Sequence, residues 1–326
     1  MIRLGLQIPS FSYPDVPNDQ LFDRVAAIAA TAEESGFDSV FVMDHFFQLP
    51  GIGRPDEPMF ECYTLLSALA ARTSRVKLGA MVGGVTYRNP AMLAKEVTAL
   101  DVISSGRAIW AIGAAWYGLE HNAFGFDFGT FTQRFEKLEE ALQIVKSMFV
   151  NHTTTFEGKW YTVKDAYNVP APVTPGGPPV LIGGSGENKT LRLVAQYADA
   201  SNVFGDATRI RRLMEVLDGH CAALGRDPEA ITRTRLGTLV LGHTHEDAVA
   251  RRNAAFATRG IDWDSVAPAA QADLAARFTI GDPDEVGEQA QALLDAGLDG
   301  LVFNLPTAYQ LDDVAFAGEV LGKVLA

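Results

Sequence analysis

The sequence of 326 residues predicts an α/β fold, a (β/α)8 TIM barrel in one domain over residues 1–326, with insertion segments at the carboxyl end of the barrel. Strand-like and helix-like segments alternate from end to end, which gives eight strands and about eight helices. A helix–glycine–strand joint at 34–40 is repeated at 295–301, so one βα repeat continues through the chain. This pattern favours a closed barrel over an open, doubly wound sheet.

The first half of the predicted barrel contains four buried strands, each a short run of apolar or β-branched residues. They are expected at 3–9, 39–43, 76–85 and 107–113. Helices are expected between them at 21–35, 59–72 and 90–103. Asn89 precedes proline at the start of the third helix, which is a typical N-terminal cap. A polar and aromatic excursion at 114–130 follows the fourth strand.

The second half continues the alternation and includes one further insertion. A strongly periodic helix is expected at 131–150, and an insertion at 153–178 contains a hairpin near 156–160. The remaining strands are expected at 179–183, 200–204, 231–241 and 300–305. The remaining helices are expected at 187–196, 207–224 and 284–296, and the chain closes on an amphipathic helix.

Composition and charge exclude several classes of protein. Hydrophobic residues make up 48% of the chain and charged residues 21%, so a disordered or low-complexity chain is excluded. The net charge of −13 argues against a nucleic-acid partner or an anionic membrane surface. No apolar run is long enough to span a bilayer, and the start lacks a signal-peptide pattern, so we expect a cytoplasmic protein. Cys62 and Cys221 are expected to be core residues, because neither lies at disulfide or metal-ligand spacing.

Asp44 and His45 are the first candidate site residues, because they follow directly on the apolar strand at 39–43. In α/β barrels the ligand lies at the carboxyl ends of the strands, so an acid and an imidazole there indicate chemistry. The alternative is a capped turn, with Asp44 as a local hydrogen-bond acceptor and His45 as a spacer. These residues alone do not decide between the two interpretations.

Two glycine-rich segments indicate where a ligand would bind. Gly79, Gly83 and Gly84 interrupt a buried strand, which is typical of a bulge or of close approach by a ligand, although glycines can also merely ease barrel packing. We expect Gly84 to face a cavity. The loop at 182–189 follows a strand and opens a helix, so its amides form a potential phosphate site, with Lys189 nearby. The alternative for this loop is a flexible turn.

The His243-Thr-His245 sequence has a spacing that some barrel enzymes use to bind a metal. However, Thr244 and Asp247 resemble a helix cap, and no carboxylate cluster stands nearby. The capped turn is the simpler interpretation, and we expect no metal site.

The combined motifs give a resemblance to a known family. They are Val42-Met-Asp-His45, Leu78-Gly-Ala-Met-Val82, Tyr87-Arg-Asn-Pro90, Gly113-Ala-Ala-Trp116 with Glu120-His121, and Ile182-Gly-Gly-Ser-Gly186. This set resembles the luciferase-like flavin and deazaflavin oxidoreductases over nearly the whole chain. It is most similar to the actinobacterial branch that uses the deazaflavin coenzyme F420.

The resemblance implies how a cofactor would be held at the barrel mouth. A non-prolyl cis peptide at Met81-Val82, with Gly83 and Gly84 beside it, would back the ring, and Asp44 would hydrogen-bond the ring edge. The resemblance also places Ala115 and Trp116 against the cofactor. The cofactor phosphate would lie on Gly183, Gly184, Ser185 and Gly186. Lys189 and Arg88 would be the cations near its anionic tail.

The resemblance also implies that His45 is the catalytic residue, as a base or as a group that orients the substrate. Trp116 stands where the related sugar-phosphate dehydrogenase has a glutamate acid, so that acid–base pair is not preserved. An indole is suited to covering a ring or an apolar substrate. Glu61 and Glu120 are the acids that could reach the mouth.

The sequence therefore predicts an F420-dependent oxidoreductase that moves a hydride between F420 and a small organic substrate, and the resemblance implies a homodimer. One alternative is an FMN-dependent luciferase-like monooxygenase, which would need a reductase and oxygen. The other is a deazaflavin-binding protein without turnover.

Overall fold

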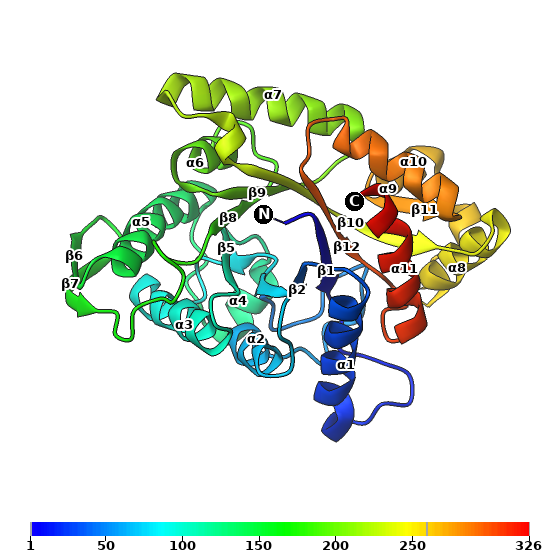
Figure 1. Cartoon of the computed structure of the whole chain (residues 1–326), viewed down its shortest axis with the longest axis horizontal. Helices are drawn as coiled ribbons and strands as arrows, with labels where there is room; N and C mark the ends of the chain where they lie inside the picture. The colour runs from blue at the N-terminus through cyan, green and yellow to red at the C-terminus, as the bar shows by residue number, and fades with distance from the viewer. Residues whose placement is uncertain (1, 259, 326) are drawn as a thin grey trace.

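The computed structural model describes residues 2–258 and 260–325, and its centre is a closed barrel of parallel strands (Figure 1). Each strand pairs with its neighbours in the order β1-β2-β3-β5-β8-β9-β10-β12, and β12 returns to β1. The bounds are β1 Leu4–Ile8, β2 Ser39–Val42, β3 Lys77–Ala80, β5 Ala108–Gly113, β8 Val180–Gly183, β9 Ala200–Val203, β10 Thr232–Leu241 and β12 Gly300–Asn304. The predicted (β/α)8 barrel is confirmed.

Two short strands, β4 and β11, belong to the same sheet but are not among the eight strands that close the barrel. The predicted strand at 76–85 is divided into β3 and β4, Gly83–Gly84, which also pairs with β5. The strand β11, Phe278–Gly281, was not predicted, and it pairs with the second half of β10. The first half of β10 pairs with β9 and closes the barrel.

Helices cover the outside of the barrel. Their bounds are α1 Leu21–Glu34, α2 Cys62–Ala70, α3 Pro90–Ile103, α4 Gly118–Phe124, α5 Phe131–Val150, α6 Thr190–Tyr197, α7 Ala207–Leu224, α8 His245–Ala257, α9 Pro268–Ala275, α10 Pro283–Leu294 and α11 Leu311–Val324. Short 3-10 turns lie at Asn18–Gln20, Pro228–Ala230 and Trp263–Ser265. In residues 2–258 and 260–325, no helix has the length and apolarity needed to cross a bilayer.

Local chemistry explains where most of these helices begin and end. The expected helix–glycine–strand joints are confirmed, since Gly36 and Gly297 have φ values of +95° and +102°. The helix expected from residue 59 begins at Cys62, because the Glu61 carboxylate accepts the amides of Tyr63 and Thr64 and caps it. Similarly, α6 begins at Thr190 and not at residue 187, after the glycine-rich loop.

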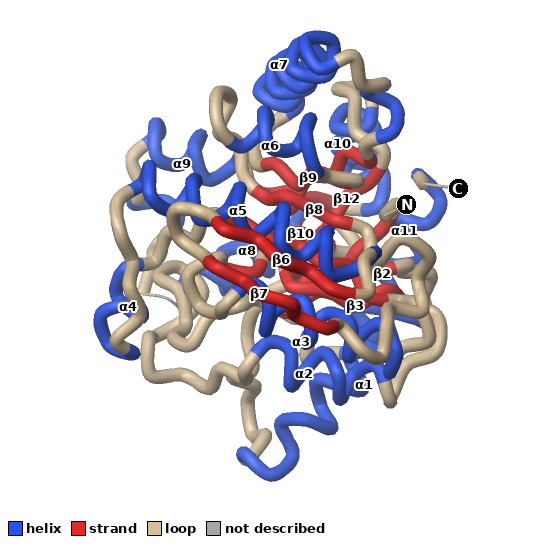
Figure 2. Tube along the Cα trace, turned by 90° about the vertical axis from the view of Figure 1, so that its left-hand side faces the viewer, coloured by secondary structure: helices blue, strands red, loops and turns tan. Residues whose placement is uncertain are grey.

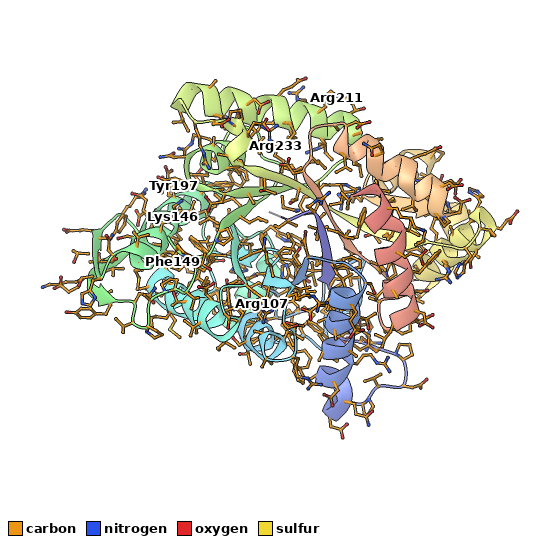
Figure 3. The ribbon with its side chains drawn as sticks, viewed as in Figure 1. Arg107, Lys146, Phe149, Tyr197, Arg211 and Arg233 are labelled. Carbon is orange, nitrogen blue, oxygen red and sulfur yellow. The ribbon has the colours of Figure 1, made fainter. Side chains whose placement is uncertain are left out.

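Basic side chains close the carboxyl ends of several helices at the amino end of the barrel, where Figure 3 labels Arg107 and Lys146. Arg107 donates to the carbonyls of Ala70, at the end of α2, and of Ser104, at the end of α3. Lys146 donates to the carbonyl of Tyr197, the last residue of α6, over 2.7 Å. The last carbonyls of a helix lack partners within it, so these cations satisfy them and interact favourably with the helix dipole.

The apolar core has two parts. A small cluster fills the barrel interior, and it includes Phe41, Met81, Ile109, Leu181 and Val302. A much larger cluster lies between the strands and the surrounding helices. The strand residues alternate between the two, as expected for a barrel packed on both faces.

The two insertions join the barrel at different ends. The segment 114–130, with α4, follows β5 and lies at the carboxyl end as expected, opposite the two termini in Figure 2. The segment at 153–178 forms the expected hairpin, β6 Thr153–Glu157 and β7 Thr162–Tyr167. It differs from the expected placement, because it leads from α5 to the start of β8 and so joins the barrel at its amino end. The indole of Trp160 holds its tip to α5 through Glu136, at 3.0 Å.

Candidate active site

Asp44 lies just after β2, and its carboxylate faces the layer of α2 and α3. Arg88 donates two hydrogen bonds to it, of 2.8 and 3.0 Å, and the amide of Gly84 donates another of 3.0 Å. Both oxygens are therefore engaged within the protein. Asp44 thereby anchors the loop after β3 to the end of β2, and its expected hydrogen bond to a ring edge stays a prediction.

Arg88 is surrounded by carboxylates and does not provide a free cation at the mouth. Besides Asp44, it forms ion pairs with Glu61 and with Glu96, the latter at 3.0 Å. Burial raises the pKa of Glu96, and the charges of Glu61 and Asp44 raise it further against the opposing effect of Arg88. The expected contact of Arg88 with an anionic tail is therefore not supported, because its charge is already neutralised.

His45 lies at the mouth beside a buried carboxylate. Its Nδ1 is 2.6 Å from Oε1 of Glu120, which also accepts from the hydroxyl of Tyr87. The other oxygen, Oε2, accepts the amides of Phe46 and Phe47 at 2.8 and 3.2 Å. Burial alone would raise the pKa of Glu120, but the hydrogen bonds from His45 and Tyr87 bring it below its usual range. The sequence alone indicated both Glu61 and Glu120 as acids that could reach the barrel mouth. In the structure it is Glu120 that contacts His45.

Aromatic side chains cover His45 from the segment after β5. Ala115 adopts a left-handed conformation with φ +56°, and the next residue, Trp116, is 61% exposed. The Trp116 and Tyr117 rings each approach the His45 ring edge-on, with centroids 5.9 Å apart. Phe46 packs on Phe124 of α4 in the same cluster. The mouth beside His45 is therefore apolar.

The bulge between β3 and β4 has the expected backbone. The Met81-Val82 peptide is cis, as predicted, and its Met81 carbonyl accepts from Gln7 at 3.2 Å. A Cβ at Gly83 would lie 3.5 Å from Oδ2 of Asp44 and 3.7 Å from the hydroxyl of Tyr63. That hydroxyl is buried and has no hydrogen-bond partner in residues 2–258 and 260–325. A Cβ at Gly83 would also lie 3.0 Å from the Ala111 carbonyl oxygen of β5, so the glycine permits a close approach of the two strands. The unsatisfied Tyr63 hydroxyl lies beside this contact.

Gly84 was expected to face an open cavity, and this expectation is wrong. A Cβ there would lie 2.5 Å from the ring of Tyr87, so the place of the missing side chain is already filled. The glycine is explained by the close approach of Tyr87, whose hydroxyl donates to Glu120.

The loop after β8 presents unpaired amides. The Gly184 amide donates to the Asn202 carbonyl, and the Ser185 hydroxyl accepts the amide of Phe204, both at 2.9 Å. The amides from 185 to 188 have no acceptor among the residues that the structure describes. Gly183 lies against Val82, because a Cβ on it would be 2.7 Å from a Val82 methyl. The loop therefore begins next to the bulge and points free amides outward.

Lys189 completes the loop. Its ammonium group lies 5.2 and 5.4 Å from the ring centroids of Phe131 and Phe135 on α5, and 3.5 Å from the hydroxyl of Thr132. It forms no ion pair within the described part of the chain, whereas the neighbouring Glu187 pairs with Arg212 at 3.0 Å. Lys189 therefore follows the unpaired amides in the chain and has no direct ion pair among the described residues, although its charge interacts with that of Glu136.

The two histidines of the possible metal site do not converge. His243 stacks on Phe316 with ring centroids 4.4 Å apart, and His245 contacts Glu285 at 2.9 Å. Thr244 caps α8 by accepting the amide of Asp247, as the simpler interpretation predicted. No group of three or more ligating side chains able to hold a metal occurs within 2–258 and 260–325.

A model of the family described as luciferase-like monooxygenase matches residues 2–300. The chain belongs to the luciferase-like monooxygenase family. The F420-dependent glucose-6-phosphate dehydrogenase of Kineococcus radiotolerans is 31% identical over 299 residues, which cover 87% of either chain.

Solved structures of the luciferase-like fold agree with the barrel described above. The F420-dependent tetrahydromethanopterin reductase of Methanopyrus kandleri has a TM-score of 0.78, covers 99% of this chain and 97% of its own, and is 19% identical. A riboflavin lyase with modified FMN has a TM-score of 0.80, covers 99% and 91%, and is 18% identical. These two likenesses establish the fold, and the site must be judged from its own residues.

Proposed function

We propose that this luciferase-like protein is an F420-dependent oxidoreductase that transfers a hydride between F420 and a small organic substrate. The observation that supports this best is the loop after β8, where unpaired amides at 185–188 are followed directly by Lys189, which has no direct ion pair among the described residues. A phosphate group is suited to such a site. The relatives whose names include F420 support the same cofactor.

The remaining site residues fit a flat ring held between the bulge and the loop after β5. Met81, Val82 and Gly83 would back the ring, with the unsatisfied hydroxyl of Tyr63 beside Gly83. Ala115 and Trp116 would cover it. When bound, the deazaflavin supplies a two-electron hydride acceptor or donor. His45 would accept or return the accompanying proton at the mouth.

We further propose that the substrate is uncharged and partly apolar. The side chains beside His45 are aromatic, and Arg88, a cation of the neighbouring loop, is neutralised by three carboxylates. A sugar phosphate would need a second cation beyond Lys189. Supplying neutral alcohols and glucose 6-phosphate with the oxidised cofactor tests this, and faster turnover of the sugar phosphate would contradict it.

A thermal-shift titration tests the cofactor. A ligand at about a hundredfold excess over its Kd stabilises the folded state by about 2.7 kcal/mol. The melting midpoint should therefore rise by several degrees with F420, since 1 kcal/mol moves it roughly 2 to 4 °C in domains somewhat smaller than this one. We expect little shift with FMN at equal concentration. An equal or larger shift with FMN would favour the flavin monooxygenase.

A variant identifies the anion site in the same titration. Lys189→Met removes the ammonium charge and keeps a side chain of similar length, so the F420-induced shift should fall. Lys159→Met is the matched control, because Lys159 lies on the hairpin and pairs with Glu136. If both variants respond to F420 as the natural protein does, the loop after β8 is not the anion site.

The assembly and location remain predictions. We propose one domain over residues 1–326 and a homodimer in the cytoplasm, as the sequence suggests. Light scattering at micromolar concentration checks the dimer, and a monomeric mass would contradict it. Hydride transfer to F420 from any alcohol in a panel separates the enzyme from a binding protein without turnover.

A further inference from the structure

We propose that Glu120 is a positioning residue that fixes His45 in the tautomer protonated at Nδ1, which leaves Nε2 as the one nitrogen that exchanges a proton with the substrate. The catalytic part of this inference rests on the proposed function. The tautomer itself is a property of the protein without any ligand.

Hydrogen-bond donors surround the carboxylate of Glu120. Oε2 accepts the amides of Phe46 and Phe47, and an amide can only donate. Oε1 accepts from the hydroxyl of Tyr87. Burial, and then the hydrogen bond to Glu120, raise the pKa of Tyr87, so the phenol keeps its proton and donates it. The hydrogen bonds around Glu120 hold its pKa below the usual range despite burial, so the carboxylate is ionised at neutral pH and both oxygens act as acceptors.

An ionised Glu120 decides the form of His45. The 2.6 Å distance between Oε1 and Nδ1 requires a proton between the two atoms, and only the imidazole can supply it. The neutral ring therefore has its proton on Nδ1 and a lone pair on Nε2. Nε2 has no hydrogen-bond partner in the described part of the chain, and the side chain is 12% exposed. The basic nitrogen is therefore the one that a substrate can reach.

The location of Glu120 explains how this chain has a carboxylate next to His45 although position 116 is a tryptophan. Glu120 lies in the first turn of α4, four residues after the indole, and it is fully buried where it contacts His45. An acid at 116 would contact the substrate, whereas Glu120 contacts only protein groups. His45 is therefore the single proton-exchanging group, held by a carboxylate that does not itself gain a proton.

A purely structural role for Glu120 would involve the other oxygen. Oε2 holds the loop after β2 to α4 through two amides, and this bond needs no particular form of His45. The structural role and the tautomer-fixing role therefore predict different effects when a neutral amide replaces the carboxylate at position 120. The amide group of Glu120→Gln still accepts the backbone bonds, but it can offer Nδ1 a donor in place of an acceptor.

Nitrogen-15 NMR of the histidine rings in the full chain without cofactor tests the tautomer. The His45 signals are identified by their loss in His45→Asn. In the natural protein at neutral pH we expect a protonated Nδ1 and a bare Nε2. In Glu120→Gln the Nδ1-protonated fraction should fall severalfold. Tyr87→Phe is the matched control, because it removes another donor to Oε1 and should leave the tautomer unchanged.

Two results would overturn the inference: a proton on Nε2 in the natural protein, or an unchanged tautomer in Glu120→Gln. The first needs no variant, so it decides the matter even if Glu120→Gln does not fold. With a turned-over alcohol, Glu120→Gln should lower kcat on the order of 10²-fold and leave KM nearly unchanged. If F420 does not bind in the titration, the proposed function is wrong, but the tautomer measured without cofactor is unaffected. Failure of the proposed function can therefore be distinguished from failure of this inference.

Discussion

At the residue scale, Gly183 shows how the two halves of the candidate cofactor site depend on one contact. It ends β8 and opens the glycine-rich loop proposed to bind phosphate, and the methyl groups of Val82 occupy the place where its side chain would lie. Val82 belongs to the bulge that follows β3. The absence of a single Cβ therefore sets how closely the loop and the bulge approach.

Adding a Cβ at position 183 should lower the free energy of unfolding. In Gly183→Ala the new methyl group would lie 2.7 and 2.9 Å from the two Val82 methyls, so the loop or the bulge must move. We expect urea denaturation to show a loss of about 1 to 3 kcal/mol, the usual effect of overpacking.

Gly322→Ala is the matched control, because Gly322 is inside α11 and a Cβ there would meet nothing within 4 Å. That variant should gain roughly 0.5 to 1 kcal/mol from the higher helix propensity of alanine. A Gly183→Ala protein as stable as the natural one would mean that Val82 is free to move.

At the element scale, α5 positions Lys189, the cation of the proposed anion site. Its first two turns contribute Phe131 and Phe135, whose rings contact the Lys189 ammonium group. The helix begins where Thr130 and Gln133 form a capping box, in which each side chain binds the other residue's amide. The position of Lys189 therefore depends on the cap of a neighbouring helix.

Loss of this cap should weaken the helix start. Thr130→Ala removes the side chain that accepts the Gln133 amide, and the expected cost is about 1 kcal/mol of unfolding free energy. Thermal or urea unfolding measures it. Gln143→Ala, at an exposed position in the middle of the same helix, should stay within about 0.5 kcal/mol of the natural protein. Equal effects at the two positions would contradict the capping argument.

At the scale of the whole molecule, Glu33 joins two separate βα units. It lies on α1, which leads into β2, and it binds the chain at the start of β3, the strand after β2. Its carboxylate accepts the amides of Ser74, Arg75 and Val76, directly before β3. Partial burial raises the pKa of Glu33, but these hydrogen bonds outweigh it and hold the pKa at about 2, below the ordinary 4.5. The ionised form is therefore favoured by folding.

This lowered pKa predicts a pH dependence. Because the folded-state pKa lies below the unfolded value, the stability from Glu33 is fully present above about pH 4.5 and is lost as the pH falls toward 2. Glu33→Gln should cost about 1 kcal/mol at pH 7, a modest figure because the group is largely accessible to solvent. The difference from the natural protein should shrink between pH 4.5 and 2.

Urea midpoints at several pH values measure this effect. Glu288→Gln is the control, since Glu288 is exposed on α10 and forms no ion pair within the described residues. A Glu33→Gln difference that stays constant from pH 7 to pH 2 would show that the carboxylate charge is not involved.

The sequence by itself determined the barrel, its eight principal strands, the glycine joints and the position of His45 after β2. It also indicated the cis peptide at Met81-Val82, through the resemblance. These features depend on local patterns: the length and apolarity of a strand, the period of a helix, and glycine where φ is positive. Of α8 only the N-terminal cap was expected, because this helix has few buried apolar positions. The short elements α4, α9 and β11, of 7, 8 and 4 residues, were missed.

Only the tertiary structure decided which polar groups meet. Glu120 binds His45 across 75 residues of sequence, and Arg88 binds Asp44 across 44, so no spacing pattern could identify either pair. Packing also decided that Tyr87 fills the space beside Gly84. Each of these contacts joins loops at the carboxyl ends of different strands. Their geometry is set by how the whole barrel closes, and local sequence does not encode it.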